Sequence, residues 1–450
     1  MSSRREAICV QPSDTDLKAD VVIAGGGPTG IAAALAVRRT GADVLLIEEQ
    51  GFLGGAVTAG LVVDYIGFFT ETPEHRPVVR GIPFELLQRL EEAGGARLIE
   101  RWSYGCFYSV DIEAFKYHVQ EMLLTEGVRL LFESRVVGAE STCGRMKSLR
   151  VQCREGEREA VADVFVDATG NGDVAAAAGA SFTFGRSEDG RTQAVSMGYL
   201  VGGVDVQRAM GVPEDELRAA MTEFERESGW SFPVDGLRYK PTLFPSTVIS
   251  VATRLHGVDG TRSDDLTRAE VELRSQVWQT MRFLRARVPG FERAFLMQTA
   301  ACVGVRETRH IAGHYTLTAD DLRNNRRFPD VVALGAWQME LHAPGTKTIT
   351  REPIPEPGDY DIPYRCLVPR DVNGLLVAGR CISATHEAAG SLRVMATCAA
   401  TGHAAGVAAA ISARTGISPS DVAVREVQSA LIQQDVELGD YWQLRGVTQP

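Results

Sequence analysis

The sequence predicts an α/β fold in which a parallel sheet carries glycine-rich turns and an α+β domain is inserted into the chain. Three short apolar strands, within residues 20–24, 164–167 and 373–378, each end in glycine and lead toward a helix. The pattern then changes over residues 191–364, where strands and helices follow one another without such turns. Strands that alternate with helices build parallel sheets, so we expect the glycine-ended strands to form one domain.

The first unit, residues 20–49, has the spacing of a dinucleotide-binding turn. Gly25, Gly27 and Gly30 follow a β-branched run and open an alanine-rich helix. In such a turn the first glycine permits a tight bend, the second admits a pyrophosphate, and the third lets the helix pack on the strand. The helix N-terminus adds unpaired N–H groups and partial positive charge. A second apolar run from Val44 ends at Glu48, whose carboxylate can accept hydrogen bonds from ribose hydroxyls.

Two later segments repeat the strand-to-glycine pattern. VFVDATGNGD, residues 164–173, is an apolar strand that reaches Gly170 before a helix of small residues. NGLLVAGR, residues 373–380, ends near Gly379, and a neutral helix is expected to start near Ser391. Ligands of parallel sheets lie beyond the carboxyl ends of the strands, so these turns favour one shared site. The structural alternative for each segment is a plain strand-to-helix turn.

Other elements follow from periodicity, capping and turn residues. Helices are predicted near residues 83–94, 111–126, 214–227, 266–288 and 419–434. An extended segment is predicted at 128–140, a hairpin at 149–153 and 160–166, strands at 194–206 and 329–334, and a proline-rich loop at 344–363.

Charge and cysteine content argue against several classes of function. The net charge of −11 disfavours nucleic-acid and anionic-membrane partners. The eight cysteines form neither CxxC nor CxxxxC, so neither a zinc ribbon nor a flavin-linked dithiol is predicted. They fit a reducing compartment, and the N-terminus shows no apolar export segment, so we expect a cytoplasmic protein. Residues 394–413 are rich in Ala, Gly and Thr, which favours a buried helix over a membrane span.

The three units, in this order, resemble the FAD-dependent oxidoreductases of the glutathione-reductase-like superfamily, which are related in fold to fumarate reductase and aspartate oxidase flavoproteins. The resemblance covers residues 20 to about 410 and is carried by AGGGPTGIAAALA, EEQGFLGGAVTAG, DATGNGD, GVRETRHIAGHYTLTADD, IPYRCLVPR and LLVAGRCISATHEAAGSLRVMATCAATGHAAG. The glycine motifs mark the superfamily. The RETR and GRCISATHEA segments are more specific and point to the family often labelled simply FAD-dependent oxidoreductase.

The resemblance implies a Rossmann-like domain that binds FAD noncovalently and an inserted α+β substrate or cap domain. The first would comprise residues 1–60, 105–190 and 365–450, and the second residues 61–104 and 191–364. The helix from Ser391 would point at the flavin N1–C2=O edge, where its dipole opposes the negative charge of reduced flavin. Glu49 departs from the family, because many relatives carry a basic residue after the ribose acid.

The residues that the resemblance implies as cofactor contacts fall in the same glycine-rich segments. They are Gly25, Gly27, Pro28, Thr29, Gly30, Glu48, Glu49, Gly54, Gly55, Ala56, Val136, Ala168, Thr169, Gly170, Gly379, Arg380, Ser391, Arg393 and Val394.

The densest polar cluster outside the glycine motifs is RETRHIAGH, residues 306–314. So much charge after an apolar run is costly to bury without partners, which indicates either a site or a structural ion-pair network. Arg306 could clamp a carboxylate in a bidentate manner. Glu307 or His310 could act as a general base. His310 and His314 are four residues apart, but no third ligand and no HExxH pattern accompany them, so no metal site is predicted.

Two further histidines are candidates for catalysis. His386 precedes the helix expected to face the flavin and is the leading candidate for proton transfer; a buried, hydrogen-bonded histidine is the alternative. His342, with Lys347 and Arg351, lies in or just before the proline-rich loop. That region suits either a substrate lid or a solvated surface loop.

These observations predict an FAD-dependent oxidoreductase that oxidises or reduces a small organic molecule by hydride transfer. The mechanistic alternative is a flavin monooxygenase that uses NAD(P)H and oxygen, because fold does not decide the second half-reaction. An NAD dehydrogenase with one cofactor would leave the second and third glycine turns unexplained. A flavin-binding subunit or RNA-modification partner without turnover of its own is the remaining alternative. We expect no nucleic-acid or membrane partner and allow a homo-oligomer.

Overall fold

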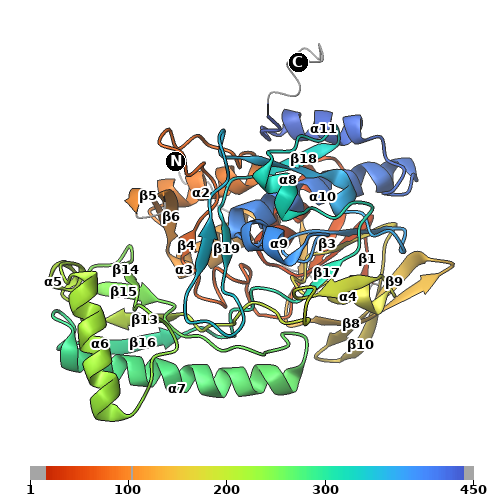
Figure 1. Cartoon of the computed structure of the whole chain (residues 1–450). Coiled ribbons are helices and arrows are strands. Elements are labelled where there is room, and N and C mark those ends of the chain that lie inside the picture. The colour runs from red at the N-terminus through yellow and green to blue at the C-terminus, as the bar shows by residue number, and fades with distance from the viewer. Residues whose placement is uncertain (1–16, 103–104, 440–450) are drawn as a thin grey trace, which may run out of the picture.

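The computed structural model describes residues 17–102 and 105–439, which form two lobes of unequal size (Figure 1). Each lobe has its own hydrophobic core. The larger core draws on the chain between residues 17 and 180 and again between 311 and 438. The smaller core consists of residues 195–303 with Leu61, Val63 and Ile112. Cys9 lies outside the described residues, and the seven described cysteines are all free thiols.

Five parallel strands form the central sheet of the larger lobe. Their order is β22 (Leu375–Val377), β11 (Val164–Asp167), β2 (Val21–Ala24), β3 (Val44–Ile47) and β7 (Arg129–Leu131). All four contacts between neighbouring strands are parallel. Every residue of β2, β3, β11 and β22 is buried, which explains why these strands are continuously apolar rather than alternating. The predicted α/β class with a parallel sheet is confirmed.

Helices α1 (Pro28–Arg39) and α10 (Met395–Thr415) pack with their backbones nearly in contact. A Cβ atom added at Gly402 would lie 2.1 Å from the carbonyl oxygen of Thr29, and one at Gly406 would lie 2.3 Å from that of Ala33. Only glycine fits such an approach. The neutral composition of α10 is therefore explained by burial, because most of this helix is enclosed by protein.

Three more of the longer helices contribute to the larger core: α2 (Ile82–Glu92), α3 (Ile112–Thr125) and α11 (Val424–Gln433). As the sequence predicts, Asp111 caps α3, and its carboxylate accepts hydrogen bonds from the backbone N–H groups of Glu113 and Ala114. Helix α11 begins five residues after Pro419, which was predicted to open it.

A second sheet flanks the parallel one, with strand order β1 (Leu17–Lys18), β10 (Gly156–Val161), β9 (Arg145–Cys153) and β8 (Arg135–Thr142). Strands β9 and β10 form the predicted hairpin, in which Cys153 pairs with Gly156. The prediction that its second arm continues to Val166 is wrong, because residues 164–167 leave the hairpin and pair with β2 instead. Both segments are apolar, so composition alone does not separate them.

The smaller lobe is an antiparallel sheet covered by helices, drawn in green and blue-green at the lower left of Figure 1. Its strand order is β14 (Tyr239–Pro241), β15 (Thr247–Ser250), β13 (Tyr199–Gly202) and β16 (Phe295–Thr299), and its helices are α5 (Val206–Met210), α6 (Glu214–Ser228) and α7 (Ser263–Arg287). Of the sheet segment predicted at 194–206, residues 199–202 form the strand, and α5 begins at Val206.

The remaining short elements lie around the larger lobe. They are the sheet β4 (Asp64–Tyr65), β6 (Gly105–Val110), β5 (Ala96–Trp102); the pairs β12 (Phe182–Phe184) with β17 (Arg309–Ile311), β18 (Val331–Gly335) with β21 (Tyr360–Pro363), and β19 (Met339–Leu341) with β20 (Thr350–Glu352); and the helices α4 (Asp173–Ala177), α8 (Ala319–Arg323), η1 (Tyr364–Cys366) and α9 (His386–Leu392).

The segment 191–364, assigned from sequence to one substrate domain, divides between the two cores. Residues 195–303 build the smaller core, whereas buried side chains from residue 311 onward join the larger one. The proline-rich stretch 344–363, expected as a loop, contains strands β20 and β21. No single helix within the described ranges meets the length and hydropathy of a membrane span; α9 and α10 do so only as a pair, bent by 91°.

Close packing of α1 on α10 makes a direct prediction. Replacing Gly406 by Ala forces a methyl group against the α1 backbone, and we expect unfolding free energy to fall by about 1–3 kcal/mol. Urea unfolding followed by circular dichroism measures the change. Ala413→Val, at a half-buried position near the end of the same helix, is the control and should change stability much less. Equal stability of the Gly406 variant and wild type would contradict the close approach.

Candidate active site

The turn after β2 has the geometry of a pyrophosphate cradle. Gly25 has a φ of +99°, and a Cβ there would lie 2.5 Å from the carbonyl oxygen of Ala168. A Cβ at Gly30 would lie 1.8 Å from the carbonyl oxygen of Gly25. At Gly27, by contrast, the nearest atom to an added Cβ is Gly55 Cα at 3.9 Å. The outer glycines are thus needed for packing, whereas Gly27 faces open space at the N-terminus of α1, where a phosphate group fits.

The predicted ribose acid, Glu48, is buried at the end of β3 beside this turn. Its Oε2 accepts the N–H of Gly26 at 2.6 Å, and its Oε1 accepts the N–H of Gln50 at 2.8 Å. Burial raises its pKa, against the effect of these hydrogen bonds. Each carboxylate oxygen has a second lone pair, so both remain able to accept from a ribose hydroxyl.

An open cavity of about 350 Å³ begins at Glu49, the residue after Glu48. It is lined by Glu49, Gln50, Glu133, Arg135, Gln152, Cys153 and Arg154. Glu49, which stands where relatives carry a basic residue, lies 3.7 Å from Arg135 of β8. Arg135 thus brings a positive charge near Glu49, and its strand also contains Val136, a predicted cofactor contact. This cavity is where the adenine end of a dinucleotide held at Gly27 and Glu48 could lie.

The loop predicted to run along the cofactor packs against the glycine turn. The N–H of Gly54 donates to the carbonyl oxygen of Gly26 at 2.9 Å, and a Cβ at Gly55 would lie 3.0 Å from Gly27 Cα. Ala56 follows and anchors the next turn, where its carbonyl oxygen accepts the N–H of Val62. The loop is therefore a wall of the cradle rather than a loose connector.

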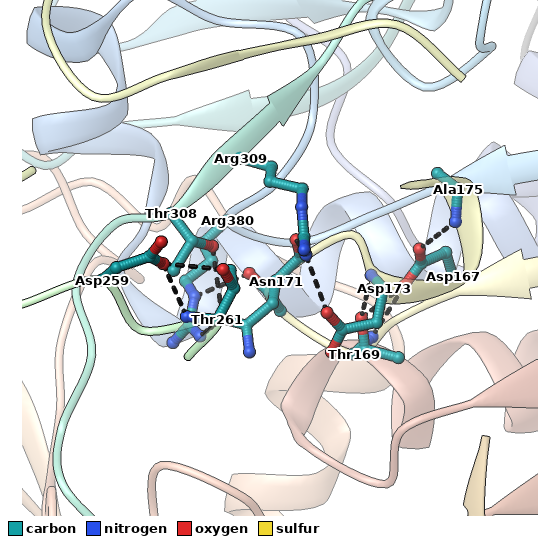
Figure 2. Close-up of polar contacts among 11 residues, drawn as sticks. Asp167, Thr169, Asn171, Asp173, Ala175, Asp259, Thr261, Thr308, Arg309 and Arg380 are labelled. Atoms are coloured by element: carbon teal, nitrogen blue, oxygen red, sulfur yellow. Dashed lines mark hydrogen bonds and ion pairs between the residues drawn. The ribbon is translucent and has the colours of Figure 1, made fainter. Parts of the chain in front are cut away.

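A fully buried acid organises the second glycine turn, and the sequence analysis did not single it out. Asp167 ends β11 and accepts hydrogen bonds from the Thr169 N–H and hydroxyl and from the N–H of Ala175 (Figure 2). Burial raises its pKa. Gly170 then turns the chain with a φ of +77°. The acid before ATG in the sequence was the available signal for this role.

Arg380 joins the third glycine turn to the second. Its Nε donates to the carbonyl oxygen of Gly170 at 2.7 Å, its Nη2 to Asn171 Oδ1 at 2.6 Å, and its Nη1 to the carbonyl oxygen of Val305 at 2.5 Å. Figure 2 shows Asn171 between Arg380, Thr308 and Arg309. The Thr308 hydroxyl donates to the side-chain oxygen of Asn171, and Arg309 donates to its backbone carbonyl oxygen. Arg380 thus links the third glycine turn to the second and to Val305 by hydrogen bonds. Its predicted contact with the cofactor stays a prediction.

The predicted helix start at Ser391 is wrong. Ser391 lies inside α9, fully buried, and its hydroxyl contacts the Tyr360 hydroxyl at 2.7 Å and the Trp337 carbonyl oxygen. The chain bends sharply after Arg393, and α10 begins at Met395 with Val394 as its N-cap. The first N–H groups of α10 are free of intrahelical partners, and the Thr397 hydroxyl in this turn is buried with no hydrogen-bond partner among the described residues. This N-terminus can therefore receive a polar edge of the flavin.

Glu307 binds two histidines with one oxygen. Its Oε1 lies 2.9 Å from His310 Nε2 and 2.8 Å from His386 Nδ1, and its Oε2 accepts the N–H of Gln193 at 2.8 Å. All three side chains are nearly inaccessible to solvent. Burial opposes ionisation of Glu307, but the hydrogen bonds from His310 and His386 outweigh it and lower its pKa to about 2. The two candidates for a general base, Glu307 and His310, therefore form one unit with His386.

The ionised state of Glu307 determines which nitrogens of His310 and His386 carry protons. An ionised carboxylate only accepts hydrogen bonds, so both contacting nitrogens carry protons. In its neutral form His386 thus holds hydrogen on Nδ1 and a lone pair on Nε2. Burial opposes protonation of His386, yet the hydrogen bond to Glu307 prevails and raises the pKa of the imidazole. His386 opens α9, the helix that leads into α10.

A second charged group surrounds Glu340 of β19. Its Oε2 accepts from Arg351 Nε at 2.8 Å, and its Oε1 lies 3.2 Å from His342 Nε2 and 3.4 Å from Arg393 Nη2. These contacts prevail over burial and hold the pKa of Glu340 well below its usual range. Arg393 is thus fixed by protein, directly before the N-terminus of α10.

His342 is buried and neutral. Its Nδ1 faces Arg254 Nη2 at 3.2 Å, and because an arginine only donates, that nitrogen accepts. The proton is then on Nε2, which donates to Glu340. Burial and the nearby Arg306 hold the pKa of His342 well below its usual value. His342 is therefore neither on a solvated loop nor a proton carrier near neutral pH, although Lys347 of the same stretch is exposed.

Glu71 adjoins this group and was missed by sequence reasoning, because nothing around it in the sequence marks it. Its Oε1 is buried and has no hydrogen-bond partner among the described residues. Burial raises its pKa to about 7.

His310 and His314, four residues apart in the sequence, do not share a helix, since residues 309–311 form β17. No group of three metal-ligating side chains occurs in the part of the chain that the structure describes.

The glycine geometry predicts separable effects on fold and cofactor. Gly27→Ala places a methyl group in open space, so the apoprotein should keep its melting temperature while FAD affinity falls at least about tenfold. Gly30→Ala should instead lower the melting temperature, because its Cβ collides with backbone. Calorimetry and fluorescence titration with FAD measure the two effects. Wild-type FAD affinity in the Gly27 variant would contradict the assignment.

The fold has distant counterparts among solved structures. One is a geranylgeranyl bacteriochlorophyll reductase-like protein from Thermoplasma acidophilum, at 13% identity, covering 94% of this chain and 85% of that one, with a TM-score of 0.46. Another is the anhydrotetracycline hydroxylase OxyS from Streptomyces rimosus, at 14% identity, covering 96% and 71%, with a TM-score of 0.45. Such values are too low to support an inference about the reaction.

Two sequence comparisons are more specific. A segment of 44 residues is 41% identical to thiamine thiazole synthase from Aeropyrum pernix, and it spans 10% of this chain and 16% of that protein. The model of the family described as FAD dependent oxidoreductase matches residues 20–431, which contain all three glycine turns and both histidine-bearing segments. The chain is therefore a member of the FAD-dependent oxidoreductase family and an enzyme of that class.

Proposed function

We propose that this enzyme oxidises or reduces a small organic metabolite by hydride transfer, with His386 as the residue that exchanges a proton with the substrate. The observation that supports this most is the buried unit of His310, Glu307 and His386. It lies where the chain passes between the two lobes, since Gln193 and Glu307 sit on the two neighbouring crossings. Sites between lobes are common places for small-molecule chemistry.

The residues present fit an FAD molecule extended over the three strand ends. Gly27 and the α1 N-terminus would hold the pyrophosphate, Glu48 the ribose, and the α10 N-terminus a polar edge of the flavin. Bound flavin supplies two-electron redox chemistry, and the protein supplies binding, orientation and proton transfer. The N–H groups at Met395 and the guanidinium of Arg393 would favour negative charge at this edge.

Proton transfer is assigned to His386 Nε2. Glu307 fixes the opposite nitrogen as a donor, so the lone pair of Nε2 is available to accept a proton when the substrate is oxidised. In the reverse direction the imidazolium returns that proton. Glu307 acts as a positioning residue in this scheme, because it holds the ring orientation and the tautomer and stabilises the positive charge. His310 shares the same carboxylate oxygen and limits its movement.

The proposed reaction is tested by anaerobic mixing of the FAD-loaded enzyme with a panel of metabolites. Bleaching of the visible absorbance of the flavin by a metabolite alone supports hydride transfer from the substrate. Bleaching that requires NAD(P)H, followed by insertion of oxygen into the metabolite, would instead support the monooxygenase alternative.

Removal of the proposed proton acceptor should slow the reductive half-reaction. We expect His386→Gln to lower its rate about 10²–10⁴-fold, with FAD content unchanged, because general-base catalysis contributes that much. Stopped-flow absorbance measures the rate. His403→Gln, a buried histidine of α10 that contacts Gln434, is the matched control and should leave the rate near wild type. A rate unaffected by the His386 change would remove this residue from the mechanism.

The role of Glu307 has a distinct signature in pH dependence. Neutral His386 is the reactive form for oxidation, so the rate should fall as pH drops through the pKa of His386. Glu307 raises that pKa, and Glu307→Gln should therefore move the acidic limb of the rate profile to lower pH. An acidic limb at the wild-type position, in a variant that retains FAD, would show that Glu307 has only a structural role.

A further inference from the structure

One half-buried arginine beside the proton-transfer unit lacks an acidic partner in the described part of the chain. Arg306 donates from Nη1 to the carbonyl oxygen of Ala194 at 2.6 Å, and no described residue offers an acceptor to its Nε or Nη2. Its side chain is half-buried, so it keeps contact with solvent. Burial, together with the nearby Arg393, lowers its pKa to about 9. A half-buried guanidinium with two nitrogens that no acceptor of the described residues contacts, and with further arginines nearby, favours an anionic ligand at this place.

Two acids of this region are already engaged by protein, and burial raises the pKa of the third, Glu71, to about 7, which reduces its negative charge. Glu340 contacts Arg351, Arg393 and the neutral His342. Glu307 serves two histidines. Positive charge is therefore in excess around Arg306, and the field of the neighbouring guanidinium groups adds to its attraction for an anion.

Further donors in the same group point to ligand binding rather than to a closed ion-pair network. Arg393 has a buried Nε with no hydrogen-bond partner among the described residues. The guanidinium of Arg254 donates hydrogen bonds to uncharged acceptors, namely the carbonyl oxygens of Thr346 and Thr348 and one nitrogen of His342. A structural network would be expected to pair these charges with carboxylates, as occurs at Arg39 with Glu85 and Glu126 on the surface.

We propose that Arg306 binds a carboxylate group of the substrate, so that the enzyme acts on a small organic acid. This inference rests on the proposed function, because Arg306 adjoins Glu307 and would hold the substrate beside His386. A guanidinium presents a planar fork that matches the two oxygens of a carboxylate. A guanidinium also binds phosphate in a bidentate manner, so inorganic phosphate is the competing ligand that the experiment must distinguish.

The test is equilibrium binding to the oxidised, FAD-loaded enzyme, which requires no turnover. Acetate, malonate and benzoate are titrated by calorimetry against acetamide, malonamide and benzamide. At least one carboxylate should bind at least about tenfold more tightly than its amide, and Arg306→Gln should weaken that binding at least about tenfold. Arg226→Gln removes an exposed charge on α6 and should leave binding unchanged.

Several outcomes would overturn the inference. Amides that bind as tightly as the acids, carboxylates that fail to bind wild type, or wild-type affinity in Arg306→Gln would each do so. Inorganic phosphate that binds more tightly than every carboxylate, and depends on Arg306, would also overturn the assignment to an organic acid. If Arg306→Gln loses its FAD or its fold, Arg306→Lys is used instead. Lysine keeps the positive charge but lacks the planar guanidinium, so this variant should also weaken carboxylate binding.

Failure of this inference is distinguishable from failure of the proposed function. A substrate that bleaches the flavin but whose amide binds equally well would leave hydride transfer intact and remove the carboxylate site. Carboxylates that bind through Arg306 without any flavin reduction would support the site and count against the proposed reaction.

Discussion

The parallel alignment of β22, β11 and β2 is the constraint on which the site depends. Because these strands run in the same direction, their carboxyl ends meet at one edge of the sheet, although they lie far apart in the sequence. Each end continues into a glycine turn, and the turns contact one another, as the close approach of Gly25 to Ala168 shows. The near-contact of α1 with α10 then fixes two helix N-termini relative to this edge, so fold stability and cofactor geometry are coupled.

The second feature of the site is the group of charged side chains at residues 306–310. The cluster at residues 306–310 is tolerable in the interior because distant segments supply its partners: Gln193 and His386 for Glu307, and Asn171 for Thr308 and Arg309. These partners come from the crossing between the lobes, from α9 and from the second glycine turn. These hydrogen bonds link the glycine turns to the proton-transfer unit. Arg306 stands beside that unit and contacts a backbone carbonyl oxygen rather than a protein acid.

Much of this arrangement could be predicted from local sequence. The glycine spacing and the acid at Glu48 follow from the needs of a phosphate turn, and the charge density after Val305 marked the 306–310 cluster. The start of α10 could not be predicted, because only Arg393 and Val394 separate α9 from α10 and no proline marks the bend between them. The end of the β9–β10 hairpin was misplaced for a similar reason, since the partner of Val164 lies in β2. Nor does the sequence indicate that Glu307 joins His310 to His386, which requires long-range contacts.

A crystal structure of the protein with bound FAD tests the central claim most directly. The account predicts that the pyrophosphate lies against Gly27 at the N-terminus of α1. It also predicts that a polar edge of the flavin meets the first N–H groups of α10, with His386 next to the flavin ring. A dinucleotide bound away from the three strand ends, or a flavin ring separated by protein from His386, would contradict the account.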